Sequence, residues 1–230
     1  MDRLILFDID HTLVKNAHGH KKAFSHAFKK VCGIDTTIDI INYHGMTDQQ
    51  IILEVLMKLE MPEETVKAAL PSIIREMVAF YLNYTEEAIE KLPGVEELLS
   101  KLYNKDYLLG LVTGNLEQIA KHKLNQVYLA DMFEVGGYGS EHSERAELVK
   151  IAMRKAEGYY QFRCNHNIVL FGDAPQDMAA GSLARVKTIG VLTGIYDEPQ
   201  LKQAGADRVV KNLENTANLM SLIADLTPLP

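Results

Sequence analysis

Two aspartates near the start of the chain directly follow a short apolar run. The segment LILF, residues 4–7, is followed by Asp8, and Asp10 comes two residues later. An apolar run of this length that stops abruptly at polar residues is typical of a buried strand. Two carboxylates at such a place can bind a divalent cation, attack an electrophile or exchange a proton. The stretch therefore predicts chemistry at the end of a strand.

Two later apolar runs also end in groups that can do chemistry. These runs span 107–113 and 166–172, and the residues at or just after their ends are Thr113, Gly114, Asn115, Asp173 and Asp177. Ligands of an open parallel sheet bind beyond the carboxyl ends of its strands, so these groups should meet in one crevice. Four carboxylates gathered there would repel one another without a cation. Oxygen ligands on rigid turns favour Mg²⁺, and the predicted ligands are Asp8, Asp10, Asp173 and Asp177.

A phosphate ester fits this set of groups. An ionised Asp8 beside Mg²⁺ could attack phosphorus, while Asp10 could protonate the departing oxygen and later deprotonate water. Thr113 and the amides near Gly114 and Asn115 could hold the phosphoryl oxygens, since glycine allows a close approach of the backbone. Each stretch alone is also compatible with a turn or a helix cap. Their occurrence at three strand ends favours the catalytic interpretation.

The elements that must position these residues alternate between strand and helix. Further strand-like runs occupy 187–194 and 207–212, and amphipathic segments lie between the later strands. This alternation predicts an α/β fold, a Rossmann-like parallel sheet with helices on both faces. Residues 15–91 instead show only helical patterns, in three apolar stripes over 23–31, 51–59 and 66–80. We therefore predict an all-α cap domain (15–91) inserted into an α/β core (1–14 and 92–230), with hinges near 14–17 and 91–93.

Composition narrows the class of protein. The chain has 230 residues, 47% of them hydrophobic, and a formal net charge of −7, which disfavours nucleic acid as a partner. No signal peptide and no membrane-spanning run is visible, so we expect a cytoplasmic protein without a membrane partner. Cys32 and Cys164 have no partners at metal-site spacing, which favours two reduced cysteines.

The motifs together resemble those of haloacid dehalogenase superfamily phosphohydrolases, specifically phosphoglycolate-phosphatase-like members with an inserted helical cap. The resemblance covers essentially the whole chain, and it rests on DIDHT (8–12), TGN (113–115), GDAPQD (172–177) and the cap stretch YHGMTDQQI (43–51). It implies that Asp8 is the nucleophile and Asp10 the acid/base, with the backbone carbonyl of Asp10 also on Mg²⁺. It further implies that Thr113 binds phosphate, that Asp173 binds the metal, and that Asp177 is a metal ligand or an acid just behind it.

The third motif of that family usually holds a lysine just before a helix, where it joins nucleophile and phosphate electrostatically. In the stretch GSEHSERAELVKIA, Arg145 aligns with this lysine and Lys150 lies further into the predicted helix. Arginine suits the role because its planar guanidinium pairs bidentately with phosphate. We favour Arg145 over Lys150. A surface salt bridge with a nearby glutamate is the ordinary alternative.

These observations predict Mg²⁺-dependent hydrolysis of a small phosphorylated metabolite, a phosphoglycolate-like or sugar phosphate monoester, through an aspartyl-phosphate. A phosphomutase of the same superfamily and a non-catalytic phosphate-binding regulator are the alternatives. His11 departs from the pattern, because relatives usually carry glycine there. It could border the pocket and bias the substrate or the pH dependence, or it could be a tolerated turn residue, which we favour. His20 and His44 are weaker candidates for contact with substrate.

Overall fold

The computed structural model describes residues 3–15, 18–83, 88–105, 107–165 and 167–228. Its centre is a six-stranded sheet in the order β5-β4-β1-β6-β7-β8, and every neighbouring pair is parallel. The strands are β1 (Leu4–Phe7), β4 (Leu108–Thr113), β5 (Val135–Tyr138), β6 (Ile168–Gly172), β7 (Lys187–Val191) and β8 (Arg208–Val210). The predicted parallel α/β sheet is confirmed.

The strand order explains why the three motifs meet. β1 lies between β4 and β6, and Phe7 at its end is level with Leu111 on one side and with Phe171 on the other. The residues that follow these strands therefore emerge side by side at one edge of the sheet. The connection reverses direction here, because the chain reaches β4 on one side of β1 and β6 on the other. Such a reversal opens a crevice at the carboxyl ends of the strands.

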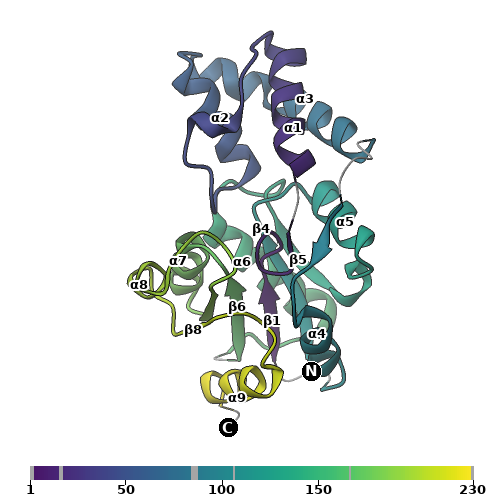
Figure 1. Ribbon diagram of the computed structural model, residues 1–230, viewed down its shortest axis with the longest axis vertical. Coiled ribbons are helices and arrows are strands. Elements are labelled where there is room, and N and C mark those ends of the chain that lie inside the picture. Colours follow the sequence, from purple (N-terminus) through teal and green to yellow (C-terminus); the bar gives the residue numbers. More distant parts are fainter. Residues whose placement is uncertain (1–2, 16–17, 84–87, 106, 166, 229–230) are drawn as a thin grey trace.

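Both faces of the sheet are covered by helices, as its alternating side chains require (Figure 1). Ile5 and Phe7 belong to a core shared with α4, α5 and α9, whereas Leu4 and Leu6 belong to a core shared with α6 and α7. The helices of this part are α4 (Val95–Tyr103), α5 (Glu117–Gln126), α6 (Arg145–Tyr160), α7 (Pro175–Ala184), α8 (Glu198–Gln203) and α9 (Thr216–Leu226).

Three short strands of the described structure were not predicted from the sequence. β5 has the sequence VGGY, and its two glycines hide the strand pattern, although all four residues are buried. β2 (Val14–Lys15) and β3 (Glu90–Lys91) pair antiparallel, so the two segments that connect the helical insertion run side by side. At two residues each, they are too short to leave a periodic signal. Of the predicted hinges, residues 16–17 lie outside the described residues.

The helical insertion stands above the carboxyl ends of the strands (Figure 1). It contains α1 (His18–Ala27), the π-helical segment η1 (Phe28–Cys32), the 3₁₀ turn η2 (Ile38–Ile40), α2 (Asp48–Lys58) and α3 (Glu63–Leu82). Gly33 ends the first stretch in a left-handed conformation with φ of 71°. The apolar core of the insertion also includes Leu116 and Ile119 at the start of α5, so the insertion packs on the sheet domain. The exact domain boundaries, 15–91 against 1–14 and 92–230, stay a prediction.

Among the described residues, no helix has the length and apolar character needed to cross a membrane.

Candidate active site

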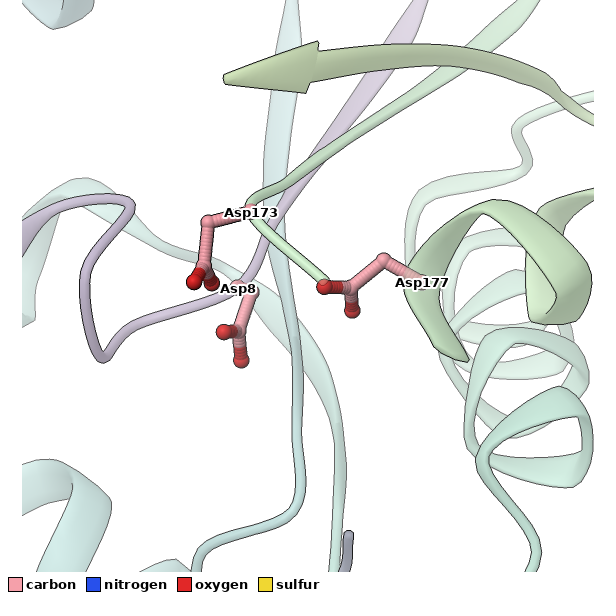
Figure 2. Close-up of side chains that lie close together, drawn as sticks. All are labelled: Asp8, Asp173 and Asp177. Carbon is pink, nitrogen blue, oxygen red and sulfur yellow. The ribbon is translucent and has the colours of Figure 1, made fainter. Parts of the chain in front are cut away.

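Three aspartates from two motifs converge at the crevice (Figure 2). Asp8 follows β1, Asp173 follows β6, and Asp177 lies in the first turn of α7; each offers a carboxylate oxygen within 4.8 Å of the others, and all three are buried. Asp177 is held locally, because its Oδ2 accepts a hydrogen bond from the Ala174 backbone N–H at 3.1 Å. Gly172 must be glycine here, since a Cβ would lie 2.3 Å from Cγ of Asp177.

Arg145 supplies the positive charge that lies against this acidic cluster. It is the first residue of α6, and its Nη2 is 2.6 Å from Oδ1 of Asp8, while its Nε is 2.6 Å from Oδ1 of Asp177. Lys150 lies further along α6 and pairs instead with Glu147 at 2.6 Å, with both side chains partly exposed. The guanidinium thus lies at the site where the third motif predicted a cation, and Lys150 lies on the surface.

One guanidinium does not balance three buried carboxylates. Burial, together with the charges of Asp177 and Asp10, raises the pKa of Asp8 from 3.8 to about 7, even though Arg145 opposes the shift. Burial and the charges of Asp8 and Asp177 also raise the pKa of Asp173 well above its usual value. A divalent cation would remove this imbalance, and a buried all-oxygen donor set is the kind that Mg²⁺ takes. The residues present therefore fit Mg²⁺, which Asp8 and Asp173 would hold with Asp177 beside them.

This imbalance predicts a pH dependence of stability in the absence of metal. The raised pKa of Asp8, from 3.8 to about 7, means that the folded state binds this proton more tightly than the unfolded state. The stabilisation is therefore complete below about pH 4 and is lost as the pH rises through about 7. In EDTA we expect the free energy of unfolding, measured with urea, to be lower at pH 8 than at pH 5.

Saturating Mg²⁺ should restore that stability at pH 8, by about 2.7 kcal/mol at a concentration one hundred times the dissociation constant. Asp8→Asn should flatten the pH dependence in EDTA, and Asp173→Asn should abolish the response to Mg²⁺. An unfolding free energy in EDTA that rises from pH 5 to pH 8 would contradict the prediction.

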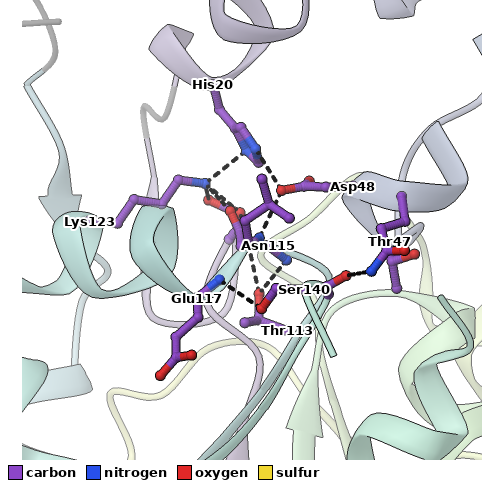
Figure 3. Close-up of polar contacts among 12 residues, drawn as sticks. His20, Thr47, Asp48, Thr113, Asn115, Glu117, Lys123 and Ser140 are labelled. Atoms are coloured by element: carbon purple, nitrogen blue, oxygen red, sulfur yellow. Dashed lines mark hydrogen bonds and ion pairs between the residues drawn. The ribbon is translucent and has the colours of Figure 1, made fainter. Parts of the chain in front are cut away.

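Asp10 lies apart from the acidic cluster, in a second polar network with Lys123 and Asn115, both of which are labelled in Figure 3. Its carboxylate oxygens are 2.8 and 2.7 Å from Nζ of Lys123, and its Oδ2 accepts a hydrogen bond from Nδ2 of Asn115 at 2.8 Å. Burial alone would raise the pKa of Asp10, but the charge of Lys123, the nearby His20 and these hydrogen bonds lower it to about 2. Asp10 is therefore a carboxylate here, the form that accepts a proton.

Lys123 was missed by the sequence reading. It lies on α5, eight residues beyond Asn115, and is fully buried. The apolar stripe of this helix includes Ala120, Leu124 and Val127, so a lysine at position 123 falls on the buried side. A charged residue within an apolar stripe is the signal that could have found it, because buried lysines are almost always paired.

The TGN segment is built into the junction between the sheet domain and the insertion. The hydroxyl of Thr113 is buried and accepts hydrogen bonds from the backbone N–H of Asn115 at 3.2 Å and from its Nδ2 at 2.7 Å. At Gly114 a Cβ would lie 2.3 Å from the carbonyl oxygen of Met46, so the insertion itself requires glycine there. Gly114 and Asn115 line the cavity between the sheet domain and the insertion, whereas Thr113 lies beneath Asn115.

A cavity of about 600 Å³ lies between the sheet domain and the helical insertion. Asp8, Asp10, Asp173 and Arg145 line its sheet side. Its other walls come largely from the insertion and are mostly apolar, with basic groups among them. They include Phe24, Ile38, Tyr43, Met46, Ile51, His20, Lys21 and His44. Burial, with the nearby charges of His11 and Lys21, lowers the pKa of His44. The cavity thus places a bound molecule between the carboxylates and the insertion.

His11 has a structural reason to be unusual. Its φ is 59°, in the left-handed region where glycine is favoured, and its N–H donates to the carbonyl oxygen of Val14 at 2.8 Å. The exposed side chain also borders the cavity. The turn explains why glycine would be favoured at this position.

We expect His11→Gly to raise the free energy of unfolding by about 0.5–1 kcal/mol. A left-handed residue with a side chain costs about 1–2 kcal/mol, and the greater freedom of glycine in the unfolded chain returns part of that gain. Urea denaturation at one pH measures the change. Gln161→Gly is a matched comparison away from the cavity, because Gln161 has φ of 53°. A destabilised His11→Gly beside a stabilised Gln161→Gly would show that the imidazole makes favourable contacts.

The sequence matches a known protein family over most of its length. Residues 5–191 match the family model of the haloacid dehalogenase-like hydrolases. The chain belongs to this family. The family resemblance inferred from the motifs is therefore confirmed, and with it the prediction that the chain is an enzyme.

Similar proteins of this family include two named enzymes. Pyrophosphatase PpaX of Listeria monocytogenes is 26% identical over 231 residues, which cover 96% of each chain. Phosphoglycolate phosphatase of Aquifex aeolicus is 24% identical over 84% of this chain and 85% of its own. Both names agree with the predicted phosphatase class. A crystal structure of a hydrolase from Pseudomonas syringae superposes with a TM-score of 0.74 at 21% identity, over 96% of this chain and 99% of that one, and shows the same fold.

Proposed function

We propose that this member of the haloacid dehalogenase-like family hydrolyses a small phosphate monoester through an aspartyl-phosphate on Asp8. The observation that carries the proposal is the pairing of two carboxylates in different surroundings at one cavity. Asp8 lies in the acidic cluster against Arg145, whereas Asp10 lies beside Lys123 and Asn115. Two carboxylates in such different environments suit two roles, nucleophile and proton carrier.

In the first half of the proposed reaction, a carboxylate oxygen of Asp8 forms a bond to phosphorus as the bond from phosphorus to the leaving oxygen breaks. A singly protonated phosphate ester supplies the proton for that oxygen. Asp10, a carboxylate in the free protein, takes this proton from the ester and gives it to the departing oxygen. Arg145, whose guanidinium touches Asp8, would hold the phosphoryl oxygens and balance their charge. Gly114 also lines the cavity, and its backbone N–H would offer a donor to the same oxygens.

In the second half, water attacks phosphorus and passes its proton to Asp10, and the bond between phosphorus and Asp8 breaks to release phosphate. Asp10 then passes this proton to the released phosphate and is again a carboxylate. When bound, Mg²⁺ would neutralise charge on the phosphoryl oxygens and on the acidic cluster. The apolar walls of the insertion would limit the water that reaches the site.

A panel of phosphate esters with Mg²⁺ and with EDTA tests this proposal. The panel should include phosphoglycolate, several sugar phosphates and pyrophosphate, given the names of the relatives. We expect free phosphate to be released from at least one small compound in Mg²⁺ but not in EDTA. An isomerised sugar phosphate as the product would instead support the phosphomutase alternative. No product from any compound would favour a non-catalytic phosphate-binding regulator.

A further inference from the structure

Lys123 lies at the centre of the network around Asp10, and every hydrogen of its ammonium group has an acceptor. Nζ is 2.7 and 2.8 Å from the two oxygens of Asp10, 2.7 Å from Oδ1 of Asn115 and 3.2 Å from Nδ1 of His20. A lysine ammonium has three hydrogens, and these three residues provide four acceptor atoms, two of them on the one carboxylate of Asp10. Because the side chain is fully buried, water does not compete for them. The ammonium is therefore held in one orientation.

Asn115 holds Asp10 from a second direction. Its Oδ1 faces Lys123, so its Nδ2 must provide the two donors, which go to Oδ2 of Asp10 at 2.8 Å and to Oγ1 of Thr113 at 2.7 Å. The carboxylate of Asp10 is thereby fixed by a lysine and an amide whose own partners are complete. It still keeps 31% of its side chain exposed, and it lines the cavity. The exposed part of its side chain therefore adjoins the cavity in which a substrate would bind.

The third partner of Lys123 comes from the helical insertion. His20 lies on α1, and its Nε2 is 3.1 Å from Oδ2 of Asp48 at the start of α2. The same oxygen of Asp48 accepts a hydrogen bond from the backbone N–H of Leu116 at 2.8 Å. An imidazole that accepts from Lys123 through Nδ1 and donates to Asp48 through Nε2 completes the chain of hydrogen bonds (Figure 3). The network therefore joins the insertion to the segment that carries Asn115.

We propose that Lys123 is a positioning residue that holds Asp10 toward the leaving group, and that this hold is complete only while α1 places His20 against Lys123. Without the insertion in this place, Nδ1 of His20 would be lost as an acceptor. The buried ammonium would keep only the oxygens of Asp10 and Asn115, so its orientation, and with it that of Asp10, would be less restricted. The arrangement links the seating of the insertion to the readiness of Asp10. This inference rests on the proposed function, because it assumes that Asp10 carries the proton.

The test compares two small substrates whose leaving groups differ in their need for a proton. One is the alkyl phosphate of the panel that is turned over best. The other is acetyl phosphate, which releases a carboxylate that needs no proton. The parameter is kcat/KM, since it reports the steps up to departure of the leaving group. In Lys123→Met we expect a loss of roughly 100-fold for the alkyl phosphate and of less than about 10-fold for acetyl phosphate, because general acid catalysis contributes roughly 10²–10⁴-fold.

Three further variants make the result specific. Lys121→Met is the matched control, because Lys121 lies on the same helix and pairs with Glu117 at the surface. Asp10→Asn should show the same leaving-group pattern as Lys123→Met. His20→Gln should show this pattern with a smaller loss, and it decides the matter if Lys123→Met proves unfolded by circular dichroism. Equal losses for both substrates, or no loss, would overturn the inference. If Asp10→Asn itself lacks the pattern, the proposed role of Asp10 has failed instead.

Discussion

Asp8→Asn is expected to abolish turnover of any phosphate ester that the wild-type chain hydrolyses. An amide nitrogen or oxygen cannot replace the carboxylate that forms the bond to phosphorus, and loss of a covalent nucleophile typically costs roughly 10⁴-fold or more in kcat. The variant should remain folded, because it removes one of three mutually repelling carboxylates from the cluster. Steady-state phosphate release, with circular dichroism on the same samples, measures both results.

The covalent route also predicts an intermediate that can be observed. Wild-type protein quenched in acid during turnover should carry one added phosphoryl group by mass spectrometry, on the peptide that contains Asp8, and Asp8→Asn should carry none. Asp225→Asn is a suitable control, because Asp225 is an exposed aspartate on α9. Turnover by Asp8→Asn within about tenfold of the wild type would rule out attack by Asp8.

Arg145→Met is expected to have the second large effect, mainly on stability. Arg145 is paired with Asp8 and Asp177, each at 2.6 Å, and all three side chains are buried. Although burial opposes its charge, the carboxylates of Asp177, Asp8 and Asp173 raise the pKa of Arg145, so it stays a cation. Removing one partner of a buried ion pair typically costs about 3–5 kcal/mol. We expect a loss of that size in the urea unfolding free energy in EDTA, and a smaller loss in Mg²⁺.

Two comparisons separate the role of Arg145 from a general effect of losing charge. Lys150→Met removes a cation from the same helix, but from a partly exposed pair, and should change stability by less than about 0.5 kcal/mol. Arg145→Lys keeps the charge, but a single ammonium does not reproduce the fork that reaches both aspartates. Its loss of stability should therefore lie between those of Arg145→Met and Lys150→Met. A larger effect of Lys150→Met than of Arg145→Met on stability and turnover would reverse the assignment.

The closed arrangement around the cavity has a consequence for substrate choice. Several contacts between the insertion and the sheet domain come from one short stretch that begins at His44: the His44 carbonyl accepts from Gln176 at 2.9 Å, and the Asp48 N–H donates to the Gly114 carbonyl at 2.8 Å. The position of this stretch therefore determines which residues of the insertion face the carboxylates across the cavity. Substrate selection and closure should be coupled through it, since both depend on the same contacts.

The sequence by itself determined the sheet, the three helices of the insertion and the aspartates of the motifs. These depend on local patterns: apolar runs of strand length, helical spacing, and the residues at the end of each run. Asp8, Asp173 and Asp177 could be expected at one place, because parallel strands present their carboxyl ends at one edge of the sheet. β5 escaped detection because two glycines within four residues hide a strand that burial supports.

Only the tertiary structure decided which cation pairs with which carboxylate. The spacing in the sequence allows either Arg145 or Lys150 to be the cation of the site. In the structure, Arg145 contacts Asp8, whereas Lys150 contacts Glu147 on the surface of α6. Lys123 lies far from Asp10 and His20 in sequence, and it meets them only because α5 packs beneath the insertion. Charge pairing depends on distances of a few ångströms between segments remote in the chain. Local sequence patterns set the elements, whereas their packing sets those distances.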